Sequence, residues 1–219
     1  STQGKFLKKI GNVGKGPGEY TRVQDIILDE KRNKIIILAY DWTLKEYNLE
    51  GEYISQFPIK YPFWMIRVLN DDEIICYLPY PSTILSNGYS LSLLSEQGKE
   101  KQLFMQRDVS HANECHVGPG FVNYLYHDTV CIWESYFDTI YGVTGDHKMT
   151  PRWTFKHTNE HCSVEQQQLE KCDFGNTYGF NQFVETKKYF FFSGYYHRRG
   201  LKLLYDKTNG KYHEVVYNH

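Results

Sequence analysis

The chain has 219 residues and nearly balanced charge, with 25 Lys and Arg against 26 Asp and Glu. The sequence shows neither the basic stripe of a nucleic-acid or anionic-membrane surface nor an apolar run near the roughly 20 residues of a membrane helix. Aromatic residues form 16% of the chain, and apolar residues at helical spacing are scarce. Because Tyr and Phe favour strands, the composition predicts a mostly β protein.

The first distinctive segment is a glycine-rich loop, GNVGKGPGEY, at residues 11–20. A phosphate-binding loop would lead into a helix, whose first amides bind the anion. Here two β-branched runs follow instead, VQDIILD and KIIILAY, separated by a charged turn at residues 29–33. Such a pattern is typical of a hairpin. We therefore interpret the loop as the connection from an outer strand at residues 5–10 to the innermost strand of the next sheet.

Turn glycines then recur along the chain with a fixed spacing. Gly4, Gly51, Gly98 and Gly145 are each 47 residues apart, and a further copy at Gly210 follows after an insertion of 18 residues. A period of 40–50 residues with about four strands is typical of one blade of a β-propeller. The sequence therefore predicts an all-β propeller with four four-stranded blades and one extra N-terminal outer strand.

The four blades are expected to form a single domain over residues 1–219, at about residues 20–58, 63–106, 120–156 and 179–217. The expected strands are VQDIILD, KIIILAY, LKEYNL and EYISQF in the first blade, WMIRVLN, EIICYLPY, YSLSLLS and EKQLFMQ in the second, FVNYLY, TVCIWES, DTIYGV and PRWTFKH in the third, and FNQFVET, KYFFFSGYY, LKLLYDK and KYHEVVY in the fourth.

The insertion at residues 157–178 is the longest departure from the repeat. It contains the one expected helix, SVEQQQLEKC, with Ser163 as a plausible N-cap. Loops beyond about 12–15 residues in compact domains are usually functional or disordered. We therefore expect this insertion and the segment HANECHVGPG to form the rim of a partner-binding surface, with a solvated excursion as the alternative.

Two similar stretches, HANECH and HTNEHC, lie on crossings that follow a fourth strand. Their His and Cys side chains are ligand types for zinc or copper, but no recognised metal-binding spacing is present. We therefore predict no metal and no cofactor, and treat the cysteines as weak metal candidates only. The two cysteines that flank SVEQQQLEK could form a disulfide if the protein is exported. The binding candidates are His111, Glu114, His116, His157, Glu160 and His161, the weak metal candidates are Cys115 and Cys162, and the candidate disulfide is Cys162–Cys172.

Catalytic residue types do not converge anywhere in the sequence. Asp25 and Glu134 could serve as acid and base in a propeller glycosidase, but neither has a second carboxylate placed against it. Asp25 is equally suited to bind backbone donors at a strand end, and Glu134 could face solvent. Cys76 and Cys131 lie in expected strands, where cysteine behaves as a small core residue. We predict no catalytic residue.

Several segments resemble a known family. The string KFLKKIGNVGKGPGEY with the strand DIILDE, then DTIYGV, the pair Pro151-Arg152, and VETKKYFFF followed by LLYDKTNGKY are similar to the NHL-related six-bladed β-propellers of Bacteroides-type bacteria. That resemblance implies six blades, export to the periplasm or cell surface, often a lipid anchor ahead of the domain, and no established activity. The sequence itself predicts four blades and one outer strand, so either the flanking blades lie outside it, or the propeller is smaller or is completed by another chain.

Two functions from different classes remain open. The favoured one is an exported binding module that recognises a protein, peptide or glycan, because no catalytic set converges. The alternative is an enzyme, either a propeller hydrolase such as a glycosidase or a metal-dependent lactonase. The fold cannot choose between them, since propellers support both.

Overall fold

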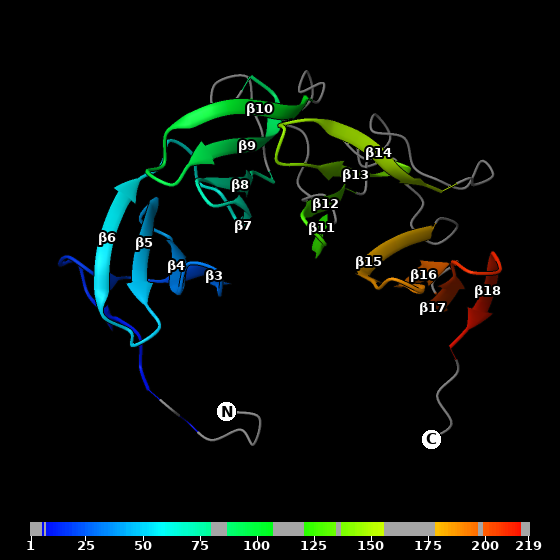
Figure 1. Cartoon of the computed structure of the whole chain (residues 1–219), viewed down its shortest axis with the longest axis horizontal. Coiled ribbons are helices and arrows are strands. Elements are labelled where there is room, and N and C mark those ends of the chain that lie inside the picture. The colour runs from blue at the N-terminus through cyan, green and yellow to red at the C-terminus, as the bar shows by residue number, and fades with distance from the viewer. Residues whose placement is uncertain are drawn as a thin grey trace. The chain divides into compact units, whose positions relative to one another are not determined.

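The computed structural model describes residues 6, 8–79, 87–106, 121–134, 137–155, 178–196 and 199–215. This part of the chain contains β-strands and turns but no helix, as the sequence composition predicted (Figure 1). Within it, no helix has the length and apolarity needed to cross a membrane.

Four antiparallel sheets follow one another along the chain, and in each of them consecutive strands are neighbours. All sixteen expected strands are present, most within two residues of their predicted ends. They are β3 (Val23–Asp29), β4 (Lys34–Ala39), β5 (Thr43–Asn48), β6 (Tyr53–Pro58), β7 (Met65–Asn70), β8 (Glu73–Tyr77), β9 (Tyr89–Ser95), β10 (Glu100–Gln106), β11 (Phe121–Tyr126), β12 (Thr129–Glu134), β13 (Thr139–Val143), β14 (Met149–Thr154), β15 (Tyr178–Glu185), β16 (Tyr189–Tyr196), β17 (Arg199–Asp206) and β18 (Lys211–Glu214).

The prediction of an outer strand at residues 5–10 was wrong. Residues 6 and 8–10 adopt no strand, and the first strands are the short parallel pair β1 (Asn12–Val13) and β2 (Glu19–Tyr20). A strand requires a neighbour to complete its hydrogen bonds, and among the described residues none pairs with this segment. Ile10 instead packs against the buried face of the first sheet, and its carbonyl accepts a 2.7 Å hydrogen bond from the Tyr20 hydroxyl.

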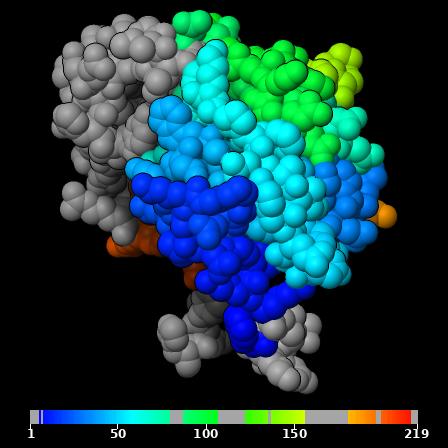
Figure 2. Space-filling model, turned by 90° about the vertical axis from the view of Figure 1, so that its left-hand side faces the viewer, coloured from blue at the N-terminus to red at the C-terminus, as the bar shows by residue number. Residues whose placement is uncertain are grey.

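The glycine-rich loop binds a carboxylate from its own sequence. The Gly16 amide donates to Glu19 Oε2 at 2.9 Å, and a side chain at Gly14 would collide with the same carboxylate. The Tyr47 hydroxyl donates to the Gly18 carbonyl at 2.8 Å and fixes the loop on the first sheet. Figure 2 shows this segment, in dark blue, on the surface. The loop is a connection, as its sequence indicated.

The turns between the third and fourth strands of the sheets follow the predicted glycine repeat in the first two sheets but not in the third. Gly51 and Gly98 have φ angles of 81° and 77°, and the amide of each donates to the carbonyl three residues earlier at 2.9 Å. In the third sheet, the residue with the same hydrogen bond and a φ of 61° is His147, not Gly145. The spacing of 47 residues therefore does not extend to the third turn. Gly4 lies outside the described residues.

The chain divides into two compact units, residues 1–108 and 109–219, and each is considered separately. The expectation of a single domain stays a prediction. In the first unit, the sheet that starts with β3 packs on the sheet that starts with β7 through an aliphatic core. Its central side chains are Ile36, Leu38, Leu44, Ile66, Ile74 and Cys76.

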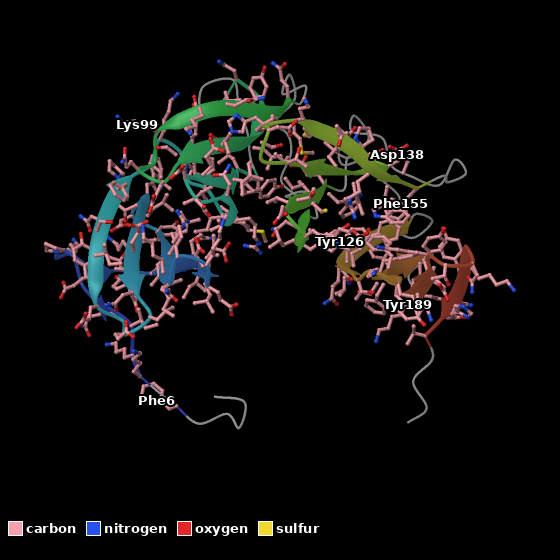
Figure 3. All side chains as sticks on the ribbon, viewed as in Figure 1. Phe6, Lys99, Tyr126, Asp138, Phe155 and Tyr189 are labelled. Atoms are coloured by element: carbon pink, nitrogen blue, oxygen red, sulfur yellow. The ribbon has the colours of Figure 1, made fainter. Side chains whose placement is uncertain are left out.

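The second unit has an aromatic core. Trp153 stacks on Phe190 with ring centroids 5.2 Å apart, and Trp133 packs edge-on against Phe183 at 5.5 Å. Figure 3 labels Phe155, which packs in the same cluster. Large rings thus fill the space between the two sheets of this unit, which is the interior position expected for most aromatic residues of a propeller.

Candidate functional site

The side chains proposed from sequence as a binding or metal site lie outside the described residues. This holds for the insertion up to residue 177 and for its expected helix as well, so all of these stay predictions. Within the described ranges, no group of three or more His, Cys, Asp or Glu side chains could hold a metal ion. The residues concerned are His111, Glu114, Cys115, His116, His157, Glu160, His161, Cys162 and Cys172.

Asp25 links two neighbouring sheets. Its Oδ2 atom accepts hydrogen bonds from the Ile66 amide at 2.9 Å and from the Arg67 guanidinium at 3.0 Å. The Ile26 amide donates to Oδ1 at 2.9 Å. Both oxygens therefore bind donors of β3 and β7, and Asp25 has the strand-end role that its sequence position allowed rather than that of a general acid or base.

The other sequence candidates for chemistry are buried. Glu134 ends β12 and is fully buried, so the suggestion that it could face solvent was wrong. Cys76 and Cys131 are also fully buried, as expected of small core residues. Burial raises the pKa of Cys131 to about 11 and raises the pKa of Cys76 as well. The raised pKa values disfavour the thiolate that nucleophilic catalysis requires.

A buried ion cluster joins the two sheets of the second unit, and sequence reasoning missed it. Glu185, at the end of β15, has a fully buried side chain. Arg152 of β14 donates to its two carboxylate oxygens at 2.8 and 3.1 Å, and Lys207 donates at 2.6 Å. The Tyr124 hydroxyl donates at 2.9 Å. The two cations also lie over the ring of Tyr126, labelled in Figure 3, at 4.3 and 4.5 Å from its centroid.

The electrostatics of this cluster favour a structural role. Burial alone would raise the pKa of Glu185, but hydrogen bonds from Arg152, Lys207 and Tyr124 outweigh it and lower that pKa. The same carboxylate raises the pKa of Arg152. The carboxylate binds donors through both of its oxygens, so the cluster acts as a clasp between two sheets. Its three charged residues lie in the segments that resemble the NHL-related family. That resemblance was the one signal in the sequence that could have drawn attention to these residues.

Three aromatic side chains are exposed at one edge of the first unit. Tyr40, Trp42 and Trp64, here called the aromatic edge, are 60%, 45% and 46% exposed. Trp133, by contrast, is 2% exposed in the core of the second unit. Most aromatic residues that the structure describes are buried or half-buried, and Tyr40, Trp42 and Trp64 are exceptions at the same end of the first two sheets.

Backbone hydrogen bonds tie the turn that carries Tyr40 and Trp42 to the start of the first sheet and to the crossing toward Trp64. The Tyr40 amide donates to the Arg22 carbonyl at 2.9 Å, at the start of the first sheet. The carbonyl of Trp42 accepts from the Ile59 amide at 2.9 Å, on the crossing that leads to Trp64. The Arg22 guanidinium lies over the ring of Tyr40, 5.4 Å from its centroid. The β4–β5 turn and the start of β7 therefore carry rings to the same end of two packed sheets.

The turn that carries Trp42 is strained and internally braced. Trp42 has a φ of 60°, a left-handed conformation that costs a bulky residue about 1–2 kcal/mol. Next to it, Asp41 Oδ1 accepts from the Thr43 hydroxyl at 2.6 Å. Asp41 Oδ2 lies 3.4 Å from Nζ of Lys45, whose side chain is only 2% exposed. Lys45 also donates to Gln56 Oε1 at 3.1 Å. An ammonium group buried below the turn thus holds the Asp41 carboxylate.

Comparisons with known proteins agree with the fold. The family described as "Domain of unknown function (DUF4934)" matches residues 1–217. A crystal structure of a candidate exported protein of Bacteroides fragilis is similar with a TM-score of 0.78 and 16% identity, over 98% of this chain and 63% of that one. BamB of Moraxella catarrhalis is similar with a TM-score of 0.52 and 14% identity, over 89% of this chain and 53% of that one. A search of curated proteins finds no match.

These similarities establish an all-β, propeller-like fold for this chain. The chain spans about three fifths of the length of the Bacteroides fragilis protein and about half of BamB. At 16% and 14% identity, neither similarity carries a ligand or an activity across.

Proposed function

The chain belongs to the DUF4934 family, and we propose that it is an exported binding module that recognises its ligand through the aromatic edge. Export is supported by the similarity to the Bacteroides fragilis protein, and the periplasm or cell surface is the proposed location. The NHL-related, six-bladed organisation suggested by the sequence belongs to the same proposal.

The observation that carries the proposal is the conformation of Trp42. Glycine or asparagine would form the same turn with less strain, whereas tryptophan retains a left-handed φ and leaves 45% of its surface exposed. Residues held in strained backbone conformations are concentrated at binding and active sites. Exposed Trp, Tyr and Arg side chains are also the types that contribute most to binding energy. Both features favour a role for this indole in recognition.

The enzyme alternative receives less support from the described residues. Asp25 is engaged by donors of two strands, Glu134 is buried, and both described cysteines are buried thiols. These four sequence candidates therefore give no support to a hydrolase.

The test compares the unmodified protein with Trp42→Gly, which keeps the turn geometry and removes the indole. Both are immobilised and presented with purified polysaccharides and with a phage-displayed peptide library. Tyr212→Ala is the matched control, because Tyr212 is a 64% exposed aromatic residue on β18 of the other unit. We expect a ligand that binds the unmodified protein and the control but not Trp42→Gly. Equal binding by all three proteins, at unchanged melting temperature, would refute the proposal.

As a separate proposal, the insertion at residues 157–178 and the segment HANECHVGPG form the rim of a partner-binding surface on the second unit. Replacement of residues 159–177 by a short Gly/Ser linker tests this directly. We expect the linker variant to fold and to lose ligand. A folded variant with unchanged ligands would contradict the idea, and a collapse in stability would reassign the insertion to a structural role.

A further inference from the structure

The polar groups of the aromatic edge point to a class of ligand. We infer that the edge binds a carbohydrate, an inference that rests on the proposed binding function. Tyr40 and Trp42 lie on either side of Asp41, whose side chain is 36% exposed. Two exposed aromatic residues therefore flank one exposed hydrogen-bond acceptor within a single turn.

The Asp41 carboxylate is held in place before any ligand arrives. Thr43 donates to one oxygen at 2.6 Å, and the buried Lys45 ammonium lies 3.4 Å from the other. Each carboxylate oxygen has a further lone pair for a ligand donor. A hydroxyl that donates to a carboxylate forms a strong, charge-assisted hydrogen bond. Because Lys45 balances its charge, the carboxylate accepts such a bond without adding net negative charge to the edge.

The rings and Arg22 complete the recognition chemistry. One face of a sugar ring presents C–H groups, which are apolar and weakly positive, and the face of an aromatic ring is weakly negative. The exposed Arg22 guanidinium, 5.4 Å from the centre of the Tyr40 ring, presents several donors to ligand oxygens. The aromatic rings can stack on the C–H faces of a sugar. The fixed Asp41 carboxylate can accept hydrogen bonds from the sugar hydroxyls, and Arg22 can donate to the sugar oxygens.

A protein partner is a weaker match to the same surface. The centres of protein–protein interfaces are depleted in charged residues other than arginine, and aspartate is among the residue types they avoid. Here a fixed carboxylate belongs to the residue between Tyr40 and Trp42 in the sequence, which resembles the few precisely placed polar groups of a small-ligand site. Arg22 would favour a sugar that carries a carboxylate, so neutral and uronic sugars are separate arms of the test.

The experiment measures binding by isothermal titration to three probes: a neutral soluble β-glucan, polygalacturonate, and polyglutamate, a polyanion without sugar faces. We expect at least one polysaccharide to bind at least about tenfold more tightly than polyglutamate. Asp41→Asn should weaken that binding about tenfold, as expected for the loss of a hydrogen bond to a charged group. Asp128→Asn, an exposed carboxylate of the other unit, should leave it unchanged.

Asp41→Asn also leaves buried Lys45 without a carboxylate, so the double variant Asp41→Asn/Lys45→Met is tested beside it. Weak binding by a double variant with the melting temperature of the unmodified protein supports the inference. No binding to either polysaccharide, equal binding to polyglutamate, or full binding by both Asp41 variants overturns it. If displayed peptides then bind in a Trp42-dependent way, the binding function survives with a protein ligand. If nothing depends on Trp42, both proposals fail.

Discussion

Replacing Glu185 with glutamine should destabilise the second unit by about 3 kcal/mol at neutral pH. Removal of one partner from a buried ion pair costs about 3–5 kcal/mol, because the remaining charge stays uncompensated. Glu185 is fully buried, while Arg152 and Lys207 remain 26% and 16% exposed and regain some hydration. Partial hydration places the expected loss at the lower end of that range.

The direction of the Glu185 pKa also predicts a pH dependence. The pKa is lowered in the folded protein, so the unfolded chain takes up its proton first as the pH falls. The stabilisation is complete above the ordinary glutamate pKa of about 4.3 and is lost as the pH falls through the folded value. The difference between the unmodified protein and Glu185→Gln should therefore shrink below about pH 4.

Thermal unfolding at pH 7 and at lower pH, followed by circular dichroism, provides the measurement. A loss of about 3 kcal/mol corresponds to a fall of about 6–12 °C in Tm for a protein of this size. Glu214→Gln is the matched control, because Glu214 is an exposed glutamate on β18, and it should change stability by less than about 0.5 kcal/mol. A loss below about 1 kcal/mol for Glu185→Gln, or a loss that does not change with pH, would refute the clasp.

Three further substitutions test other features. His147→Gly should raise the stability by about 1 kcal/mol, since glycine removes the strain of a left-handed residue, and an unchanged or lower Tm would contradict the revised turn. Glu19→Ala should leave the Gly16 amide without its acceptor, so hydrogen exchange at Gly16 should accelerate relative to the other amides of the loop. Burial raises the pKa of Tyr47 to about 12, so the unmodified protein should lose stability between about pH 10 and 12 as the unfolded tyrosine ionises first. Tyr47→Phe should flatten the curve of stability against pH in this range. Identical curves for the two proteins would show that Tyr47 does not cause the alkaline loss of stability.

The strands were predictable because their signals are local. A run such as KIIILAY between charged turn residues indicates a strand without reference to any other part of the chain. The two errors in the predicted strands and turns concern features that are not local in this way. The expected strand at residues 5–10 lacks a neighbour, which only the tertiary structure reveals. The third turn uses His147 as its left-handed residue, so the regular position of Gly145 was a coincidence of spacing.

The site was less predictable because it depends on contacts between distant residues and on burial. Arg152 and Glu185 are 33 residues apart, and nothing in either segment indicates that they meet. Trp42 lies in the turn before β5 and Trp133 lies within β12, and one is 45% exposed and the other 2%. Hydrophobicity places tryptophan inside on average, and only the packing of the sheets identifies the ring that stays outside.

The clasp in the second unit has a consequence for how this family changes over evolution. A substitution that removes the guanidinium at Arg152 leaves a buried carboxylate with one cation, and its cost depends on what occupies position 185. Residues that share a buried network are energetically coupled, so their effects do not add. Substitutions at these two positions should therefore be correlated among relatives. Where an apolar residue replaces Arg152, a residue without a carboxylate should replace Glu185. Covariation between the two positions would thus identify adjacent blades in relatives whose structures are not known.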